Sequence, residues 1–202
     1  MRVIVFGSGP IGTAVREVLE KNGHEVVTVG RTSGEHQADL TDKAGLAALF
    51  ARIGPFDAVA SAAGDVFPGA LAEATDAQWA KSIAAKGMGQ INLVRAALPH
   101  ITDGGSFTLV SGVLGDEVTQ QSTIGATVNN MVEGFVKAAA TELPRGLRIN
   151  CVSPTVLAES VAYYPFFPGF TPVPAAEVGL AYLRAMANPL TGRILKLHRT
   201  DS

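Results

Sequence analysis

Three glycines near the start of the chain have the spacing of a phosphate-binding loop. Gly7, Gly9 and Gly12 follow a short apolar run at 2–6 and precede an amphipathic helical pattern. The first glycine allows a tight turn out of a strand, the second lets the backbone approach a pyrophosphate, and the third lets the helix pack on the strand. The free N–H groups of a helix beginning near Ile11 would favour phosphate charge. The loop therefore predicts a dinucleotide site, with a bare packing turn as the alternative. Its residues are Gly7, Ser8, Gly9, Pro10, Ile11 and Gly12.

A cationic residue follows the next apolar run, at 25–29. An acidic residue at the end of this strand would bind the 2′-hydroxyl of an adenosine ribose, whereas an arginine accommodates a 2′-phosphate. Arg31, with the hydroxyl groups of Thr32 and Ser33, therefore favours NADP(H) over NAD(H), and a solvated loop arginine is the alternative. Asp39 is either an acceptor for the adenine edge or a loop residue near a helix cap, and the sequence leaves both open.

Small residues follow the third apolar run. This run, at 56–60, leads into the stretch Ser-Ala-Ala-Gly at 61–64. Small side chains at the carboxyl end of a strand leave room for a flat ligand beside the first strand. A helical pattern then extends from 75 to 100, where Gly87 and Gly89 interrupt it. These glycines lower the intrinsic helix stability and suggest close packing against a neighbouring element.

Strand and helix patterns alternate along the chain. Further strand patterns lie at 106–110, 147–152 and 192–197, and a second long helical pattern lies at 123–143. This alternation predicts an α/β fold with a doubly wound parallel sheet of about seven strands and helices on both faces. A chain of 202 residues is expected to form one domain, 1–202.

Composition narrows the function classes. A net charge of -2 with mixed signs argues against nucleic acid or a membrane surface as partner. The chain has no apolar run of about 18 residues and enters a core strand directly, so a cytoplasmic protein is expected. Its single cysteine, Cys151, lies in an apolar strand pattern and is expected to be a buried small hydrophobe rather than a nucleophile. One thiol makes neither a disulfide nor a zinc site, and no metal is expected.

Taken in order, these motifs resemble the short-chain dehydrogenase/reductase family over nearly the whole chain. The matching segments are the glycine loop, Arg31, Asp39-Leu40, Ser61-Ala62-Ala63-Gly64, Gly105-Ser106-Phe107 with Ser111, Ala138-Ala139-Ala140-Thr141-Glu142-Leu143, and Arg148-Ile149-Asn150 with Ser153-Pro154. The resemblance implies a Rossmann-type fold, an oxidoreductase activity and a nicotinamide cofactor. It also implies cofactor contacts from Leu40, Ala62, Ala63, Gly64, Asn129, Pro154, Thr155 and Val156.

The resemblance fails at the catalytic residues. Members of the family use a tyrosine as proton donor, a lysine four residues later, a serine about thirteen residues earlier and often an asparagine on the preceding long helix. The corresponding positions hold Gly125, Asn129, Gly112 and Lys86. Because glycine and asparagine do not titrate, the proton donor is missing or relocated, although Asn129 can still hydrogen-bond the cofactor ribose.

Four side chains are candidate substitutes. Lys86 would enter the site from the long helix, with a solvated helix lysine as the alternative. Ser111 precedes the expected serine position by one residue and is expected to face the other side of the strand end. Tyr163 and Tyr164 belong to an aromatic segment at 163–170, where the family builds its substrate lid. This segment would supply an apolar pocket and a phenol, and a packed surface loop or subunit contact is the alternative.

Two functions remain open. One is an NADP(H)-dependent oxidoreductase that transfers a hydride to a small carbonyl or enone, with a non-standard or missing proton donor. The other is a catalytically silent NADP(H)-binding regulator or scaffold. In both cases the resemblance implies a homodimer or homotetramer through the two long helices, 75–100 and 123–143. Their small residues suit close helix contacts, and these are Gly87, Gly89, Ala138, Ala139 and Ala140.

Overall fold

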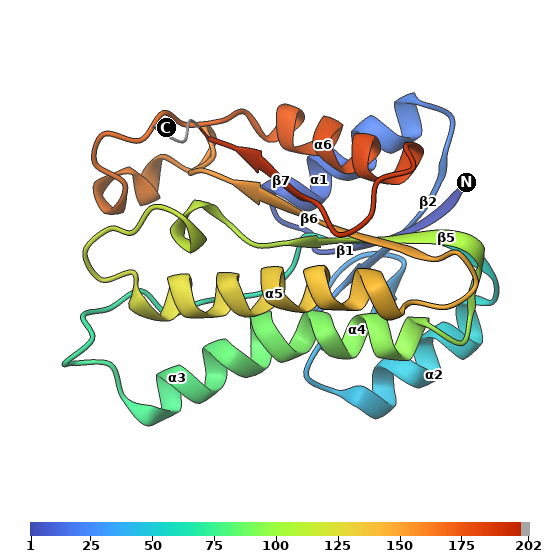
Figure 1. The fold of residues 1–202 in the computed structure, drawn as a ribbon, viewed down its shortest axis with the longest axis horizontal. Coiled ribbons are helices and arrows are strands. Elements are labelled where there is room, and N and C mark those ends of the chain that lie inside the picture. Colours follow the sequence, from blue (N-terminus) through green and yellow to red (C-terminus); the bar gives the residue numbers. More distant parts are fainter. Residues whose placement is uncertain (199–202) are drawn as a thin grey trace.

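The computed structural model describes residues 1–198, which form one parallel sheet covered by helices (Figure 1). The seven strands are β1 (Arg2–Phe6), β2 (Glu25–Gly30), β3 (His36–Gln37), β4 (Phe56–Ser61), β5 (Ile101–Val110), β6 (Arg148–Pro154) and β7 (Ile194–Leu197). Their order is β3-β2-β1-β4-β5-β6-β7, and every neighbouring pair is parallel. The predicted α/β fold with a doubly wound sheet of seven strands is confirmed.

Helices cover both faces of the sheet, α1 and α6 on one and α2, α4 and α5 on the other (Figure 1). These helices are α1 (Pro10–Lys21), α2 (Lys43–Ile53), α4 (Gly89–Ala97), α5 (Thr123–Glu142) and α6 (Ala175–Ala187). Because side chains alternate across a strand, Val3 and Val5 of β1 join one apolar cluster, and Ile4 and Phe6 join the other. Both faces of the central strands are therefore buried, which explains their continuous apolar runs.

The direction of winding reverses between β1 and β4. In doubly wound sheets, ligands bind in the crevice at the carboxyl ends of the strands flanking such a point. Phe6 at the end of β1 is in register with Ser61 at the end of β4. The Ala62 N–H donates to the Phe6 carbonyl at 2.7 Å. The glycine loop and the small-residue stretch after β4 therefore leave the sheet side by side.

The long helix predicted at 75–100 contains a π-helical turn. It consists of α3 (Asp76–Ser82), a π-helical segment (Ile83–Met88) and α4 in direct succession. α3 begins after a capping box in which Thr75 and Gln78 bond each other's backbone N–H. The predicted long helix is thus confirmed, and its π turn was not predicted because hydrophobic spacing does not distinguish one π turn from α-helix.

Close packing explains the two glycines of this helix. A β-carbon on Gly87 would lie 2.6 Å from the sulfur of Met131 on α5. A β-carbon on Gly89 would lie 2.9 Å from the β-carbon of Leu40. The glycines thus bring the helix against α5 on one side and against the segment after β3 on the other.

Local differences from the sequence expectations have simple causes. β3 was not predicted because its two residues carry no apolar run. β5 begins at Ile101, five residues before the predicted start, since Asp103 and two glycines hide its first half. Short 3-10 helices occupy Val113–Gly115 and Val161–Phe166, the latter inside the aromatic segment. Across residues 1–198, none of the helices is long and apolar enough to cross a bilayer.

Candidate functional site

The glycine loop between β1 and α1 combines two crowded positions with one open position. Gly7 has a φ of +115°, and a β-carbon there would press against the Ala62 carbonyl. A β-carbon on Gly12 would collide with the carbonyl oxygen of Gly7. On Gly9, in contrast, a β-carbon would meet no atom within 4 Å. The fold requires Gly7 and Gly12, whereas the open side of Gly9 leaves room for a ligand.

α1 directs its N-terminus to this open side. Gly9 is the N-cap residue, Pro10 begins the helix, and neither a capping side chain nor an acidic residue is present in the first turn. The first N–H groups of a helix have no partner within the helix, and the helix dipole adds positive potential. The loop is thus a cradle that favours an anion, and a pyrophosphate fits its backbone donors.

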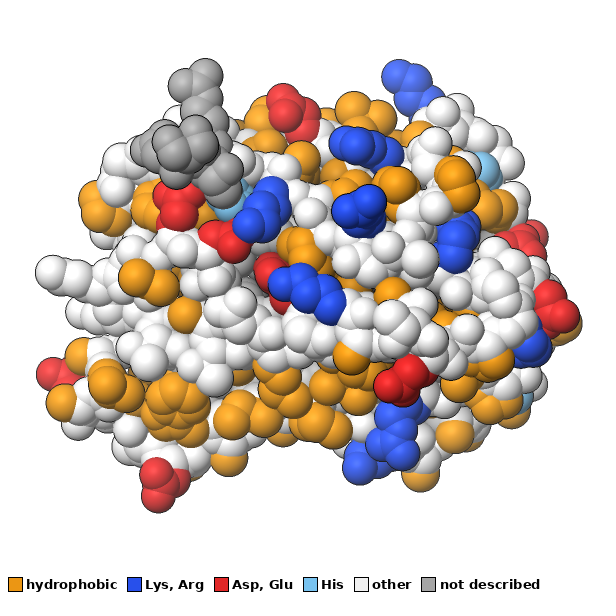
Figure 2. Space-filling model, in the orientation of Figure 1, with side chains coloured by type: hydrophobic (Ala, Val, Ile, Leu, Met, Phe, Trp, Pro, Cys, Tyr) orange, Lys and Arg blue, Asp and Glu red, His pale blue; other side chains and the backbone are white. Residues whose placement is uncertain are grey.

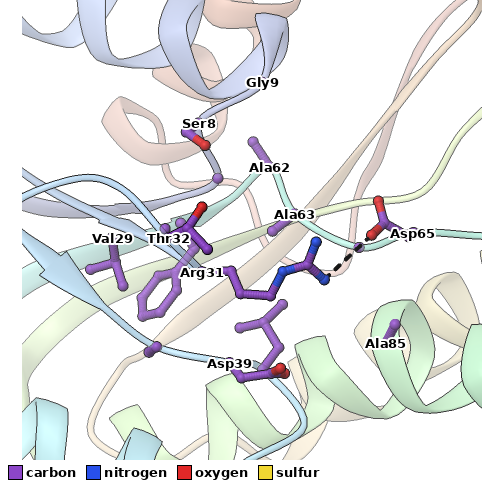
Figure 3. Close-up of a pocket in the computed structure, with 16 residues that line it drawn as sticks. Ser8, Gly9, Val29, Arg31, Thr32, Asp39, Ala62, Ala63, Asp65 and Ala85 are labelled. Carbon is purple, nitrogen blue, oxygen red and sulfur yellow. Dashed lines mark ion pairs between the residues drawn. The ribbon is translucent and has the colours of Figure 1, made fainter.

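A cavity of about 310 Å³, termed the first cavity, adjoins the glycine loop (Figure 3). It gathers residues that follow β1, β2 and β4 and that are far apart in the sequence. Most of the predicted cofactor residues line it, namely Gly7, Ser8, Gly9, Arg31, Thr32, Asp39, Leu40, Ala62, Ala63 and Gly64. The fold therefore assembles one concave site from three separate sequence motifs.

The Arg31 side chain extends across the first cavity toward Asp65 (Figure 3). Its Nη1 lies 3.8 Å from the Asp65 Oδ2, and the two side chains are 71% and 78% exposed. An ion pair this long and this exposed contributes little free energy. Arg31 is therefore available to another anion. Asp65 was missed in the sequence because a lone acidic residue after Gly64 carries no spacing signal.

Asp39 both lines the first cavity and holds a turn. Its Oδ1 accepts hydrogen bonds from the Thr41 N–H at 2.8 Å and from the Thr41 hydroxyl at 2.7 Å. These bonds, with a smaller contribution from Arg31, hold the pKa of Asp39 below its usual value against a weak opposing effect of burial. The two roles that the sequence left open are thus compatible in one residue.

Other predicted cofactor residues do not line the first cavity. Pro10 and Ile11 form the first turn of α1, while Gly12 and Ser33 line a separate cavity of about 260 Å³. Asn129 lines a further cavity, described below, and the remaining three, Pro154, Thr155 and Val156, are buried at the end of β6 and directly after it. Their contacts with a cofactor stay a prediction.

A second cavity, of about 510 Å³, adjoins the first one. Gly64 and Asp65 line both, so the two cavities meet at the end of the β4 strand. The second cavity is open to solvent and is lined by the segment after β4, the start of α5 and the aromatic segment. Its apolar lining residues are Val66, Phe67, Pro68, Leu114, Phe166 and Phe167, and its polar ones include Lys86, Asn129 and Tyr163.

Three of the four positions aligned with the family's catalytic residues line the second cavity, namely Lys86, Gly125 and Asn129. The fourth, Gly112, lies beside them, since the Asn129 Nδ2 donates to its carbonyl at 3.1 Å. The Asn129 Oδ1 is buried and has no hydrogen-bond partner within residues 1–198. Because buried acceptors are normally paired, this oxygen is suited to a ligand hydroxyl.

Lys86 is connected to a buried carboxylate through Ser111. The Lys86 Nζ donates to the Ser111 carbonyl at 2.9 Å, and the Ser111 hydroxyl donates to the Glu133 Oε1 at 2.8 Å. The Ser111 hydroxyl is turned to Glu133 on α5, and Ser111 is not among the residues that line the second cavity. Sequence reasoning missed Glu133. The available signal was an acidic residue four positions after Asn129, between Val132 and Val136 on an otherwise buried helix face.

The two candidate tyrosines differ in their surroundings. Tyr163 is 57% exposed and lines the second cavity. The Tyr164 hydroxyl donates to the Ala158 carbonyl at 3.0 Å, and this residue does not line the cavity. The structure thus brings Tyr163, but not Tyr164, to the candidate site.

Comparison with known proteins identifies a matching family and similar structures. A profile of the family described as enoyl-(acyl carrier protein) reductase matches residues 7–178. The crystal structure of the protein lin1944 from Listeria innocua superposes with a TM-score of 0.95, at 40% identity over 98% of this chain and 100% of that one.

Two curated sequences are more distant relatives. Elsinochrome reductase 1 from Elsinoe fawcettii is 25% identical over 159 residues, which are 75% of this chain but only 57% of that protein. An uncharacterized NAD-dependent oxidoreductase from Mycobacterium tuberculosis is 28% identical over 194 residues, or 87% of this chain and 70% of that protein.

Proposed function

The chain belongs to the short-chain dehydrogenase/reductase family, and we propose that it is an NADP(H)-dependent oxidoreductase that reduces a small carbonyl or enone. The observation that carries this proposal is the meeting of the two cavities at Gly64 and Asp65. A dinucleotide bound along the first cavity would reach the second, where a substrate can sit. The bound cofactor would supply the hydride. The chain would bind and orient the cofactor and the substrate, and would protonate the substrate.

The residues of the first cavity fit the cofactor in distinct ways. The cradle at Gly9 and the start of α1 would hold the pyrophosphate through backbone donors. The adenosine end would lie near Thr32, Asp39 and Leu40. In the second cavity, the unpaired Oδ1 of Asn129 would accept a hydrogen bond from a ribose hydroxyl.

Arg31 supports a preference for NADP(H) over NAD(H). A 2′-phosphate offers an arginine two charge-assisted hydrogen bonds, which its weak 3.8 Å pair with Asp65 does not provide. The name of the Mycobacterium tuberculosis relative specifies NAD for that protein. The preference for NADP(H) is thus a proposal about this chain's own Arg31.

The lining of the second cavity supports a small, partly apolar substrate. Phe166 and Phe167 of the aromatic segment line this cavity of about 510 Å³ together with Val66 and Leu114. Pockets with apolar walls and few polar groups bind small organic ligands and fix their orientation through those polar groups. A carbonyl or enone matches this pattern, since only its oxygen needs a polar partner.

The test is turnover by the cofactor-free protein supplied with NADPH and a panel of small aldehydes, ketones and enones. We expect NADPH absorbance to fall with at least one compound and one alcohol or saturated carbonyl to form per NADPH consumed. Absence of any turnover across a broad panel would contradict the proposal.

The silent binder remains the second candidate, because Gly112, Gly125 and Asn129 replace titratable residues of the family. This version predicts that NADPH changes the oligomeric state or a partner's affinity without being consumed. Identical assembly with and without NADPH, measured by light scattering, would contradict it.

We also propose that the chain works in the cytoplasm as one domain and as a homodimer or homotetramer through α4 and α5. Hydrophobic side chains form a band across the lower part of the face in Figure 2, in the region where Figure 1 places α3, α4 and α5. Ile91 and Phe135 are half-buried residues of α4 and α5. A monomeric mass at micromolar concentration would contradict this assembly.

A further inference from the structure

We propose that Lys86 is the proton donor of the second cavity and that Glu133 is its positioning residue, acting through Ser111. The inference rests on the proposed reductase function and adds the group that completes its chemistry. The proton donor then lies in the π-helical segment between α3 and α4, on the helix that faces α5, rather than on α5 itself.

The position of Lys86 favours this role. Lys86 lies in the π-helical segment, lines the second cavity and donates through its Nζ to the Ser111 carbonyl at 2.9 Å. A β-carbon on Gly64 would lie 2.7 Å from the Lys86 Cγ, so the lysine stem packs directly against Gly64. Gly64 is one of the two residues shared by both cavities. The ammonium group is therefore held where a cofactor in one cavity would meet a substrate in the other.

The buried carboxylate of Glu133 gives Lys86 a charge partner. Glu133 is only 3% exposed, and its Oε1 accepts a hydrogen bond from the Ser111 hydroxyl at 2.8 Å. A buried carboxylate is costly unless it is paired and hydrogen-bonded. Ser111 links the two charges, because its carbonyl binds the lysine and its hydroxyl binds the glutamate. The three residues form one polar unit between the π-helical segment, the end of β5 and α5.

The charges on α5 are arranged differently from those of the family. Residues four apart share a helix face, so Gly125, Asn129 and Glu133 face the same way. The first two carry no charge, and the third is an acid. The cation comes instead from Lys86 on the opposite helix. The chain has thus kept a cation beside the site while moving it to the other wall.

The environment also brings the lysine into the pH range for proton transfer. Burial lowers the pKa of the Lys86 ammonium to about 8, against the opposing influence of Cys151 and Glu133. Cys151, buried as expected, stays protonated because burial raises its pKa to about 12. Asp65 and Tyr163 are the other titratable groups that line the cavity. An acid that titrates near neutral pH delivers a proton efficiently.

The proposed step is balanced. The carbonyl carbon of the substrate accepts the hydride, and the π electron pair of the C=O bond moves to oxygen. That oxygen takes a proton from the Lys86 ammonium, which becomes a neutral amine. The substrate is reduced, the cofactor is oxidised, and Lys86 regains a proton from solvent through the open cavity.

The first test needs no substrate. The protein has six lysines, so labelling with ¹³C-lysine gives few ε-carbon signals, and the signal absent from Lys86→Met belongs to Lys86. We expect this signal to titrate near pH 8 and to move to lower pH in Glu133→Gln, because the carboxylate stabilises the ammonium. Titration near 10.4, the value of an unperturbed lysine, would overturn the proposal. So would an unchanged midpoint in Glu133→Gln.

The second test is kinetic. Removal of a general acid typically lowers turnover by about 10² to 10⁴, so Lys86→Met should lose this much in kcat while NADPH affinity stays within about threefold. Glu133→Gln should shift the loss of kcat at high pH to lower pH. The exposed Lys81, on the preceding turn of the same helix, provides the matched control, since Lys81→Met should retain full activity.

The outcomes separate the two proposals. Failure of the wild-type protein to bind NADPH would overturn the proposed function. Turnover by Lys86→Met at the wild-type rate would overturn only the role of Lys86. A wild-type protein that binds NADPH and has Lys86 titrating near pH 8, yet reduces nothing in the panel, would overturn the donor role and favour the silent binder.

Discussion

The two cavities are built in opposite ways. The first uses backbone groups of the glycine loop and one exposed arginine, and each of these belongs to a short local sequence motif. The second uses side chains such as Lys86 and Asn129, which come from helices that meet only in the folded protein. A backbone cradle tolerates most sequence change, whereas a side-chain site is altered by single substitutions. The first cavity carries the motifs that resemble the family's cofactor site, whereas the second carries Lys86, Gly125 and Asn129 at the positions aligned with the family's catalytic residues.

The largest expected effect separates structural from ligand-binding glycines in the loop. Gly12→Ala should lower the free energy of unfolding by about 3 kcal/mol, because the new methyl group collides with the Gly7 carbonyl. Gly9→Ala should leave the melting temperature unchanged and weaken NADPH binding at least tenfold, since its methyl group enters the open cradle. Urea unfolding and calorimetry measure the two quantities. If the two variants had the same free energy of unfolding, or the same affinity for NADPH, the distinction between crowded and open glycine positions would be contradicted.

Lys86, which lines the second cavity, should make the free energy of unfolding depend on pH. The pKa of Lys86 falls from 10.5 to about 8 on folding, so between these values the unfolded chain binds more protons and stability rises with pH. Relative to Lys86→Met, the wild type should gain on the order of 3 kcal/mol from pH 8 to pH 10.5.

Unfolding of both proteins across this pH range provides the measurement. The Cys151 thiol, whose pKa rises from 9.0 to about 12 on folding, lowers stability with rising pH in both proteins. The difference between the two curves therefore isolates Lys86. Parallel curves would show that the lysine is not buried as described.

Arg31 and Asp65 should change the first cavity in opposite directions. Arg31→Ala should weaken NADPH binding about tenfold, or about 1.4 kcal/mol, and leave NADH binding within about twofold. Asp65→Asn should strengthen NADPH binding by a few-fold at most, because the exposed pair it removes is weak. An equal loss for both cofactors in Arg31→Ala would show that the arginine does not recognise the 2′-phosphate.

The smallest expected effect distinguishes the two tyrosines of the aromatic segment. Tyr164→Phe should lower the free energy of unfolding by about 1 kcal/mol through loss of the bond to the Ala158 carbonyl. Tyr163→Phe should leave stability unchanged, since its exposed hydroxyl makes no hydrogen bond to any of residues 1–198. Chemical unfolding measures both, and the reverse ranking would contradict the assignment of Tyr164 as structural.

The elements of the first cavity could be predicted because each depends on local sequence. Glycine spacing, the apolar runs and the position of Arg31 are read within a few residues, and the parallel sheet then brings them together. The long helix predicted at 75–100 is present, and only its π turn was not predicted, because a π turn does not alter hydrophobic spacing noticeably.

The second cavity could be predicted only in part. The replacement of the family's catalytic residues was visible in the sequence, but the connection from Lys86 through Ser111 to Glu133 was not. Those three residues lie on separate elements, and their contacts depend on how the helices pack. The partner of Ser111 could not be predicted for the same reason, since a strand end does not reveal which side chain turns toward a buried carboxylate.

Calorimetric titration of the cofactor-free protein with NADPH and NADH in parallel tests the central claim most directly. The claim is that the first cavity is a working NADP(H) site. We predict that NADPH binds at least tenfold more tightly than NADH, a difference of about 1.4 kcal/mol. Absence of binding by either nucleotide would contradict the claim, and the glycine cradle would then serve only the packing of α1 on β1.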